Sequence, residues 1–169
     1  MQRAAYYSLI CAVVISTAAA PLPAAVGVGD KAPDFSLSSV DSRYSVRLSD
    51  HSGNPILLIF WMSNCAHCRA EAPVIQKLYA GLSGKGLSVV GLSVDESRSA
   101  ACDFVKSCKL AFPNAFAGTD RGKEVMAAYG LIHVPMLYVI GKDGRVKAVW
   151  SGEAEERAIR SVLAQQGVK

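Results

Sequence analysis

Two cysteines three residues apart, where an apolar run meets a helical pattern, constrain this chain most. The run Ile56–Trp61 has the length and the continuous apolar character of a strand covered on both faces. Apolar residues at helical spacing follow between about Cys65 and Leu82, and glycines close the pattern. The sequence therefore predicts a buried strand that ends beside the first turn of a helix, with Cys65 and Cys68 in that turn.

The two sulfurs differ in their predicted surroundings. Cys65 is placed at the start of the helix, where unpaired backbone N–H groups and the positive end of the helix dipole stabilise a thiolate. Cys68 lies one turn further in. We therefore predict that Cys65 attacks a substrate disulfide and that Cys68 resolves the resulting mixed disulfide. This exchange needs no cofactor.

Besides a redox dithiol, a Cys-x-x-Cys pair can form half of a zinc site or a structural disulfide. Tetrahedral zinc needs two further ligands, usually a second closely spaced pair. Cys102 and Cys108 have five residues between them on a predicted helix, so they make a poor second pair, and we expect no metal. On an intact helix their six-residue separation spans about 9 Å, too far for a disulfide. They can pair only if the helix ends before Cys108, and this question stays open.

Strand and helix patterns alternate along the rest of the chain. A second buried strand is predicted at Leu87–Val94, and an Asp-Gly turn at residues 143–144 between two alternating runs indicates a hairpin. Further helices are predicted at Ser97–Cys108, Asp120–Tyr129 and Glu153–Gln166, and an N-terminal hairpin within residues 34–48. The predicted fold class is α/β, with a mixed central sheet flanked by helices and an added N-terminal hairpin.

Residues 1–25 are expected to form a signal peptide in front of a single domain at 26–169. The segment has one basic residue, Arg3, then the apolar stretch Ala4–Ala20, then prolines and small residues. A retained membrane anchor is the alternative, but about 17 residues give only about 26 Å of helix against a hydrocarbon core of roughly 30 Å. Cleavage would remove Cys11 and leave four cysteines, an even number that suits an oxidising compartment such as the periplasm.

The charge of the chain argues against a nucleic-acid partner. The net charge is +4, which is far from the concentrated basic patch that DNA or RNA binding requires. We therefore expect no nucleic-acid partner. The expected partners are disulfides or thiols of other proteins, and the expected state is a monomer.

Four stretches of the sequence resemble the thioredoxin-like superfamily. Within it, the chain is similar to the extracytoplasmic thiol-disulfide oxidoreductases of the TlpA, ResA and cytochrome c biogenesis type. The likeness covers nearly all residues from Val28 onward. The stretches that carry it are Gly29–Phe35, Phe60–Pro73, Val89–Asp95 and Val134–Gly144.

This resemblance implies a thioredoxin-like fold and a reductase that acts on exported proteins, with apocytochrome c as one such substrate. A membrane thiol donor would return electrons to the dithiol. In the resembled fold the proline at Pro135 is cis and packs against the dithiol, which leaves the backbone of Val134 free to pair with an extended substrate. From the residues alone, Pro135 is a proline at the edge of a strand.

Ala66 and His67, the residues between the two cysteines, put the direction of electron flow in doubt. A partial positive charge on His67 would favour the Cys65 thiolate and make the disulfide more oxidising. Reducing members of the resembled family often have proline here, whereas a histidine before the second cysteine is similar to disulfide-forming oxidases. A solvated histidine with little effect is the alternative.

Two more residues near the dithiol are candidate site residues. Glu71 matches an acid of the resembled family and would accept or relay a proton near Cys68, unless it is an ordinary surface charge of the helix. Classical thioredoxins have a buried aspartate where this chain has Ile59, so a proton relay must come from elsewhere. Trp61 is expected to flank the dithiol and help dock the substrate.

Three other functions compete with the reductase. The oxidase direction is the nearest alternative. A peroxidase of the same fold would need a serine or threonine and a proline where this chain has Met62 and Leu58. A Cu(I)-binding protein would use the soft thiolates of Cys65 and Cys68.

Overall fold

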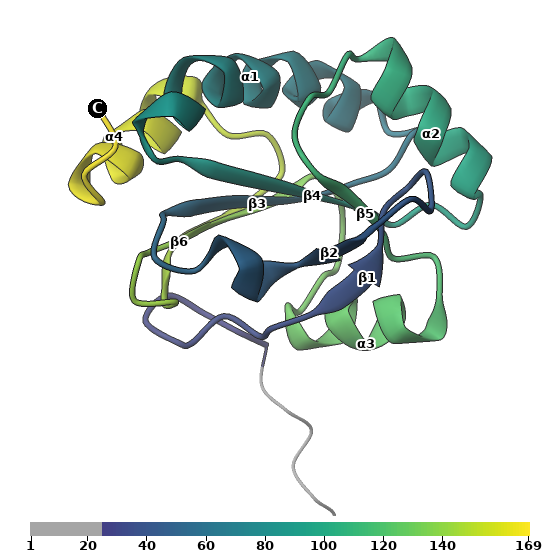
Figure 1. The fold of residues 1–169 in the computed structure, drawn as a ribbon, viewed down its shortest axis with the longest axis horizontal. Coiled ribbons are helices and arrows are strands. Elements are labelled where there is room, and N and C mark those ends of the chain that lie inside the picture. Colours follow the sequence, from purple (N-terminus) through teal and green to yellow (C-terminus); the bar gives the residue numbers. More distant parts are fainter. Residues whose placement is uncertain (1–24) are drawn as a thin grey trace, which may run out of the picture.

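The computed structural model of the protein describes residues 25–169 (Figure 1). Nearly all of the predicted signal peptide, with Arg3 and Cys11, lies outside the described residues. Within 25–169, no helix has both the length and the apolar character needed to cross a membrane.

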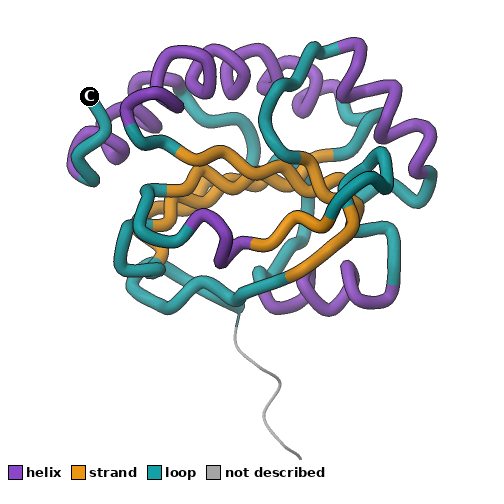
Figure 2. Tube along the Cα trace, viewed as in Figure 1, coloured by secondary structure: helices purple, strands orange, loops and turns teal. Residues whose placement is uncertain are grey.

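A five-stranded mixed sheet forms the centre of the fold, as the sequence predicts (Figure 2). Its strand order is β5-β4-β3-β6-β7. The parallel strands β3, β4 and β5 form one half, and β6 runs antiparallel to both β3 and β7. The bounds are β3 Ile56–Trp61, β4 Ser88–Ser93, β5 Asn114–Phe116, β6 Met136–Ile140 and β7 Val146–Ser151. The sequence did not predict β5, which is only three residues long.

The central strand β3 is buried along its whole length because helices and loops cover both of its faces. Its six residues are all buried, and they alternate between two apolar clusters, one on each face of the sheet. Figure 1 shows α1, α2 and α4 on one face and α3 on the other. The helices are α1 Ala66–Leu82, α2 Arg98–Ser107, α3 Asp120–Ala128 and α4 Glu156–Gln165, each within a few residues of its prediction.

The predicted N-terminal hairpin is present as a separate two-stranded sheet. Strand β1, Ser36–Ser38, pairs antiparallel with β2, Ser45–Arg47. The apolar residues of the hairpin, Leu37 and Val46, pack into the cluster on the α3 face of the central sheet. Two short 3₁₀ helices complete the fold, η1 Leu48–His51 and η2 Ser83–Lys85.

Trp61, the last residue of β3, ties three elements together next to the start of α1. Its ring is 2% exposed and stacks on Phe104 of α2 with centroids 4.6 Å apart. Its indole Nε1–H donates to Oδ1 of Asn114 in β5 at 3.1 Å. Gly91 in β4 leaves room for this bond, because an added Cβ would lie 2.1 Å from Asn114 Oδ1 and 2.8 Å from Trp61 Nε1.

Replacing Gly91 by alanine is therefore expected to destabilise the fold. The methyl group would displace the buried Trp61–Asn114 hydrogen bond, so Gly91→Ala should lower the free energy of unfolding by about 1–3 kcal/mol. Urea unfolding followed by tryptophan fluorescence and circular dichroism measures the change. Gly81→Ala in α1 is the matched control, because nothing lies within 4 Å of the added Cβ. It should be neutral or stabilise by up to about 1 kcal/mol. Equal stability of the Gly91 variant and the wild type would contradict this packing.

Candidate active site

Cys65 caps the N-terminus of α1 with its sulfur. The residue has an extended backbone, and the backbone N–H of Cys68 donates to Cys65 Sγ at 3.2 Å. Serine, threonine, aspartate and asparagine usually fill this position with a side-chain oxygen. A sulfur in this place receives both a backbone hydrogen bond and the positive end of the helix dipole, as the sequence predicts for the attacking cysteine.

The segment before β6 brings a second part of the site to Cys65. The Cys65 thiol lies 3.6 Å from the carbonyl oxygen of Val134, to which it donates. The Val134–Pro135 peptide bond is cis, which confirms what the resemblance implied. Val134 is therefore in contact with the dithiol although 69 positions separate it from Cys65 in the sequence.

Cys68 lies behind Cys65 in the interior of the protein. Its side chain is 1% exposed, whereas Cys65 is partly exposed. Burial, and after it the hydrogen bond with Cys65 and the charges of Cys65 and Asp95, together raise the pKa of the Cys68 thiol to about 12, against the lowering effect of the Met62 backbone N–H. The two sulfurs thus differ in access and in proton affinity, which fits an attacking and a resolving cysteine.

Glu71 is buried one turn after Cys68 on α1. The side chain is 3% exposed, so the surface-charge alternative is wrong. Its Oε2 accepts from the backbone N–H of Ala154 at 3.3 Å, and no hydrogen bond reaches its Oε1 among the described residues. Burial raises the pKa of the Glu71 carboxyl; the Ala154 N–H opposes this and the charge of Glu153 adds to it.

His67 points outward from the first turn of α1, next to the exposed Ala66. Its Nδ1 lies 2.5 Å from Oε1 of Glu153, in a pair whose histidine side chain is 74% exposed. Glu153 and Ala154 are neighbours in the loop between β7 and α4. This loop therefore holds α1 at two points, through His67 and through Glu71.

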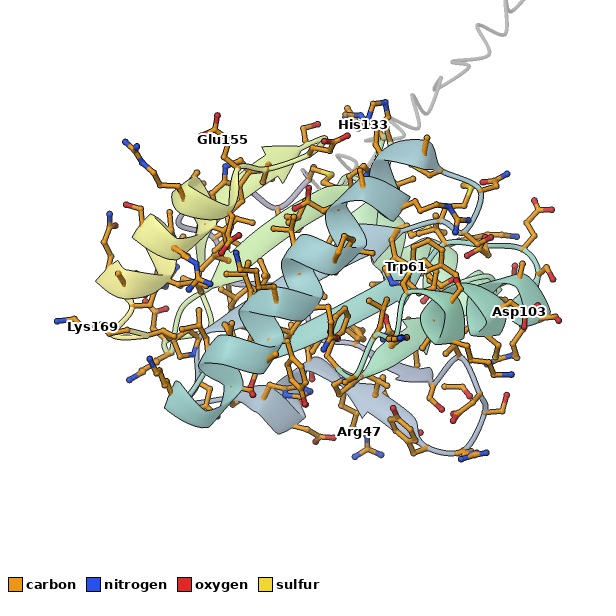
Figure 3. All side chains as sticks on the ribbon, turned by 90° about the horizontal axis from the view of Figure 1, so that it is seen from above. Arg47, Trp61, Asp103, His133, Glu155 and Lys169 are labelled. Atoms are coloured by element: carbon orange, nitrogen blue, oxygen red, sulfur yellow. The ribbon has the colours of Figure 1, made fainter. Side chains whose placement is uncertain are left out.

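Trp61 does not have the docking role that we predicted for it. Its ring is buried under α2 and has almost no surface to offer a substrate; Figure 3 shows it next to α2. Exposed side chains near the dithiol are found instead on the segment before Val134, besides Ala66 and His67. Ile132 is 82% exposed, and the exposed His133 contacts Ser151 Oγ through Nε2 at 2.6 Å. His133 is at the rim of the molecule in Figure 3.

Asp95 is a site residue that the sequence reasoning did not single out. It follows β4 and is buried, and its carboxylate accepts hydrogen bonds from the backbone N–H and the Oγ–H of Ser63 and from Ser93 Oγ–H. Ser63 belongs to the turn that leads from β3 to Cys65. The available signal was its position: Asp95 lies two residues after β4, a strand parallel to β3, so it is at the same edge of the sheet as the dithiol.

Cys102 and Cys108 do not join the site. Helix α2 ends at Ser107, and both cysteines are free thiols. The Cys102 thiol donates to the carbonyl of Val40 at 3.1 Å. Among the described residues, no group of three or more His, Cys, Asp or Glu side chains is placed to hold a metal ion.

A cavity of the described chain is remote from the dithiol. It has a volume of about 330 Å³ and contains Ile56 and Ile140 in its lining. Ile56 begins the strand whose other end leads to Cys65, so the cavity lies at the opposite edge of the sheet. The reactive sulfur is presented on a surface, which suits a large substrate that approaches from outside.

Comparisons with known proteins agree with this geometry. Residues 28–149 match the model of the AhpC/TSA family. The chain is 32% identical over 136 residues to the thiol-disulfide oxidoreductase ResA of Bacillus thuringiensis subsp. konkukian, covering 80% of this chain and 76% of that protein. It is 33% identical over 139 residues to ResA of Geobacillus thermodenitrificans, covering 82% and 78%.

Solved structures show the same fold. A Chlorobium tepidum protein, solved as a candidate thiol:disulfide interchange protein DsbE, superposes with a TM-score of 0.76 at 28% identity, over 84% of this chain and 99% of that one. StoA from Bacillus subtilis superposes with a TM-score of 0.64 at 21% identity, over 78% and 96%.

The burial of Glu71 predicts how stability depends on pH. The folded state holds the Glu71 proton more tightly than the unfolded state, whose pKa is about 4.3. Stability is therefore lost as pH rises from about 4 to the folded pKa, by up to about 1.4 kcal/mol for each pH unit in that range. Glu71→Gln has no carboxyl group to titrate and does not lose this stability. The free energy of unfolding of the variant minus that of the wild type should therefore increase with pH up to the folded pKa of Glu71 and stay constant above it.

Urea unfolding at several pH values between 4 and 9 measures this difference. Glu155→Gln is the matched control, because Glu155 is an exposed glutamate of the neighbouring loop. Its difference from the wild type should stay nearly constant with pH. A constant difference for the Glu71 variant as well would show that Glu71 is not desolvated.

Proposed function

The chain belongs to the AhpC/TSA family and is a thiol-disulfide oxidoreductase, and we propose that it works as an extracytoplasmic reductase of disulfides in exported proteins. Cys65 is the attacking sulfur and Cys68 the resolving one. One observation carries the proposal: the partly exposed Cys65 sulfur caps α1 and touches Val134, with a buried thiol behind it.

In the first step, the Cys65 thiolate attacks one sulfur of the substrate disulfide. A bond forms between Cys65 Sγ and that sulfur, the substrate S–S bond breaks, and the other substrate sulfur leaves as a thiolate. The Cys68 N–H that donates to Cys65 Sγ stabilises the negative charge before the attack.

Val134 supports the docking of an extended substrate segment. Among the described residues, no protein group accepts from the Val134 N–H, and the Val134 carbonyl faces the reactive sulfur. An extended peptide next to its own cysteine can pair with both groups in the manner of an added strand. The exposed Ile132 would meet an apolar side chain of the same segment. Cys65 and Val134–Pro135 thus act as one docking and reaction surface.

In the second step, Cys68 loses its proton and attacks Cys65 Sγ. The Cys65–Cys68 disulfide forms, the mixed disulfide breaks, and the second substrate thiolate leaves and takes up a proton. Two electrons pass from the dithiol to the substrate. Glu71 is the proposed proton acceptor, because it lies one turn from Cys68 on α1 and its Oε1 has no hydrogen-bond partner among the described residues. A membrane dithiol donor would restore the reduced form.

The surroundings of His67 favour the reductase over the oxidase. A positive charge on His67 would make the disulfide oxidising, but the carboxylate of Glu153 balances this charge at 2.5 Å and solvent screens it. The leader pattern of residues 1–25 and the relatives named ResA support a place outside the cytoplasm, where exported proteins, apocytochrome c among them, meet the dithiol.

The direction of electron flow is tested by the reduction potential. Equilibration of the dithiol with glutathione redox buffers should give a potential nearer to about −270 mV, as in thioredoxin, than to about −120 mV, as in the strongly oxidising enzymes. The fraction of Cys65–Cys68 disulfide is read by mass spectrometry after acid quenching and alkylation. A potential near −120 mV would make the oxidase the correct assignment.

The roles of the two sulfurs are tested by trapping with a peptide that contains an internal disulfide. Cys68→Ala should accumulate a covalent 1:1 adduct on Cys65, because the resolving thiol is missing. Cys65→Ala should form no adduct, and Cys108→Ala, the control, should reduce the peptide at the wild-type rate. Peptide mapping identifies the modified cysteine. An adduct on Cys102 or Cys108 would show that the assigned site is wrong.

A further inference from the structure

The carboxylate of Asp95 is fully occupied by hydrogen bonds within the site. Oδ1 accepts from the Ser63 backbone N–H at 3.0 Å and from Ser63 Oγ–H at 2.6 Å. Oδ2 accepts from Ser93 Oγ–H at 2.7 Å. Among the described residues, no ion pair involves Asp95, so the negative charge is held in the interior by these donors alone.

These bonds fix the turn between β3 and α1. Ser63 is held by Asp95 at its N–H and its hydroxyl, and Arg69 Nη2 donates to the Ser63 carbonyl at 2.8 Å. The carbonyl of the preceding residue, Met62, accepts from the Cys65 N–H at 3.3 Å, and the backbone N–H of Met62 lowers the pKa of the Cys68 thiol. Both cysteines thus depend on a turn that Asp95 anchors.

Asp95 and Glu71 are both buried carboxylates, but they differ in whether an oxygen is left without a hydrogen-bond donor. Glu71 has an oxygen without a partner among the described residues, which can take a proton. Both oxygens of Asp95 have donors, and no hydrogen bond joins Asp95 to Cys68 in the described chain. Asp95 therefore acts on Cys68 through the turn and through its charge, because like charges oppose ionisation most strongly where water is excluded.

We propose that Asp95 is a positioning residue of the exchange reaction, which fixes the Met62–Ser63 turn and places a buried carboxylate at the edge of the sheet where the dithiol lies, so that it sets the rate at which the mixed disulfide is resolved. The inference rests on the proposed roles of Cys65 and Cys68. While Cys65 is a thiolate, its negative charge and that of Asp95 both keep Cys68 protonated. Once Cys65 is bonded to the substrate its charge is gone, and the field of Asp95 remains to control the second step.

Other titratable and charged groups also lie around the dithiol. Cys65 caps α1, and His67, Arg69 and Glu71 lie on it; the segment before β6 adds His133 and the loop after β7 adds Glu153. The substitution Asp95→Asn leaves all of these in place. It keeps one oxygen that can accept from the Ser63 N–H, replaces the other oxygen by an NH₂ group, and removes the negative charge.

The test follows thionitrobenzoate release after one equivalent of dithiobis(nitrobenzoate) is mixed with the reduced chain in a stopped-flow instrument. Cys11, Cys102 and Cys108 are first replaced by serine, so that only the dithiol reacts. The first phase reports attack by Cys65 and depends on reagent concentration. The second phase reports attack by Cys68 on the mixed disulfide and does not. Both phases are recorded between pH 6 and 11.

In Asp95→Asn, the second phase should be about three to ten times faster at neutral pH, with the midpoint of its pH profile lower by about 0.5–1 on the pH scale. The first phase should stay within about twofold. Glu96→Gln is the control, because it removes the same charge from the exposed neighbouring residue and should leave both phases unchanged. An unshifted midpoint, or a slower second phase at every pH, would overturn the inference.

A second variant covers the case that Asp95→Asn does not fold. Ser93→Ala removes one donor from the carboxylate, so the charge is less neutralised and the midpoint should rise; an unchanged midpoint would overturn the inference. If the proposed roles of Cys65 and Cys68 are wrong, the result differs from a failure of the Asp95 inference. Both phases would then persist in Cys65→Ser, or the wild type would show no second phase.

Discussion

A sulfur atom caps helix α1, and the chemistry of the site depends on this one hydrogen bond. The Cys68 N–H donates to Cys65 Sγ, so in the proposed mechanism the resolving residue holds the attacking atom in place before any substrate arrives. The cap requires β3 to end at Trp61 and the chain to turn within three residues, and it points the sulfur at the Val134 carbonyl. Substrate docking, attack and resolution therefore meet at one position.

Three segments that are far apart in the sequence set the properties of the two thiols. The turn after β3 is held by Asp95, the backbone that we propose docks the substrate comes from Val134, and the loop after β7 contacts α1 through Glu153 and Ala154. The same loop also reaches the docking segment, because Gly152 N–H donates to the carbonyl of Pro135. A shift of this loop would change His67, Glu71 and the docking segment together.

The parts of the site that depend on local sequence were predictable, and those made by distant contacts were not. Cys65 and Cys68 follow from an apolar run that enters a helix, and the cis bond at Pro135 followed only from resemblance. The burial of Glu71 depends on a loop 83 positions away, and helical spacing carries no trace of it. Trp61 was expected to flank the dithiol and help dock the substrate, but α2 and β5 enclose its ring. Strand β5 itself is too short for a periodic signal.

The proposed mechanism requires one accessible, reactive sulfur in front of one buried sulfur, and native alkylation measures this directly. The reduced protein is treated with limiting iodoacetamide at neutral pH, and each cysteine is followed over time by peptide mapping. Cys65 should be modified first, with Cys68 protected until the protein is unfolded. Modification of Cys68 at the same rate as Cys65, or of Cys102 or Cys108 before Cys65, would contradict the mechanism.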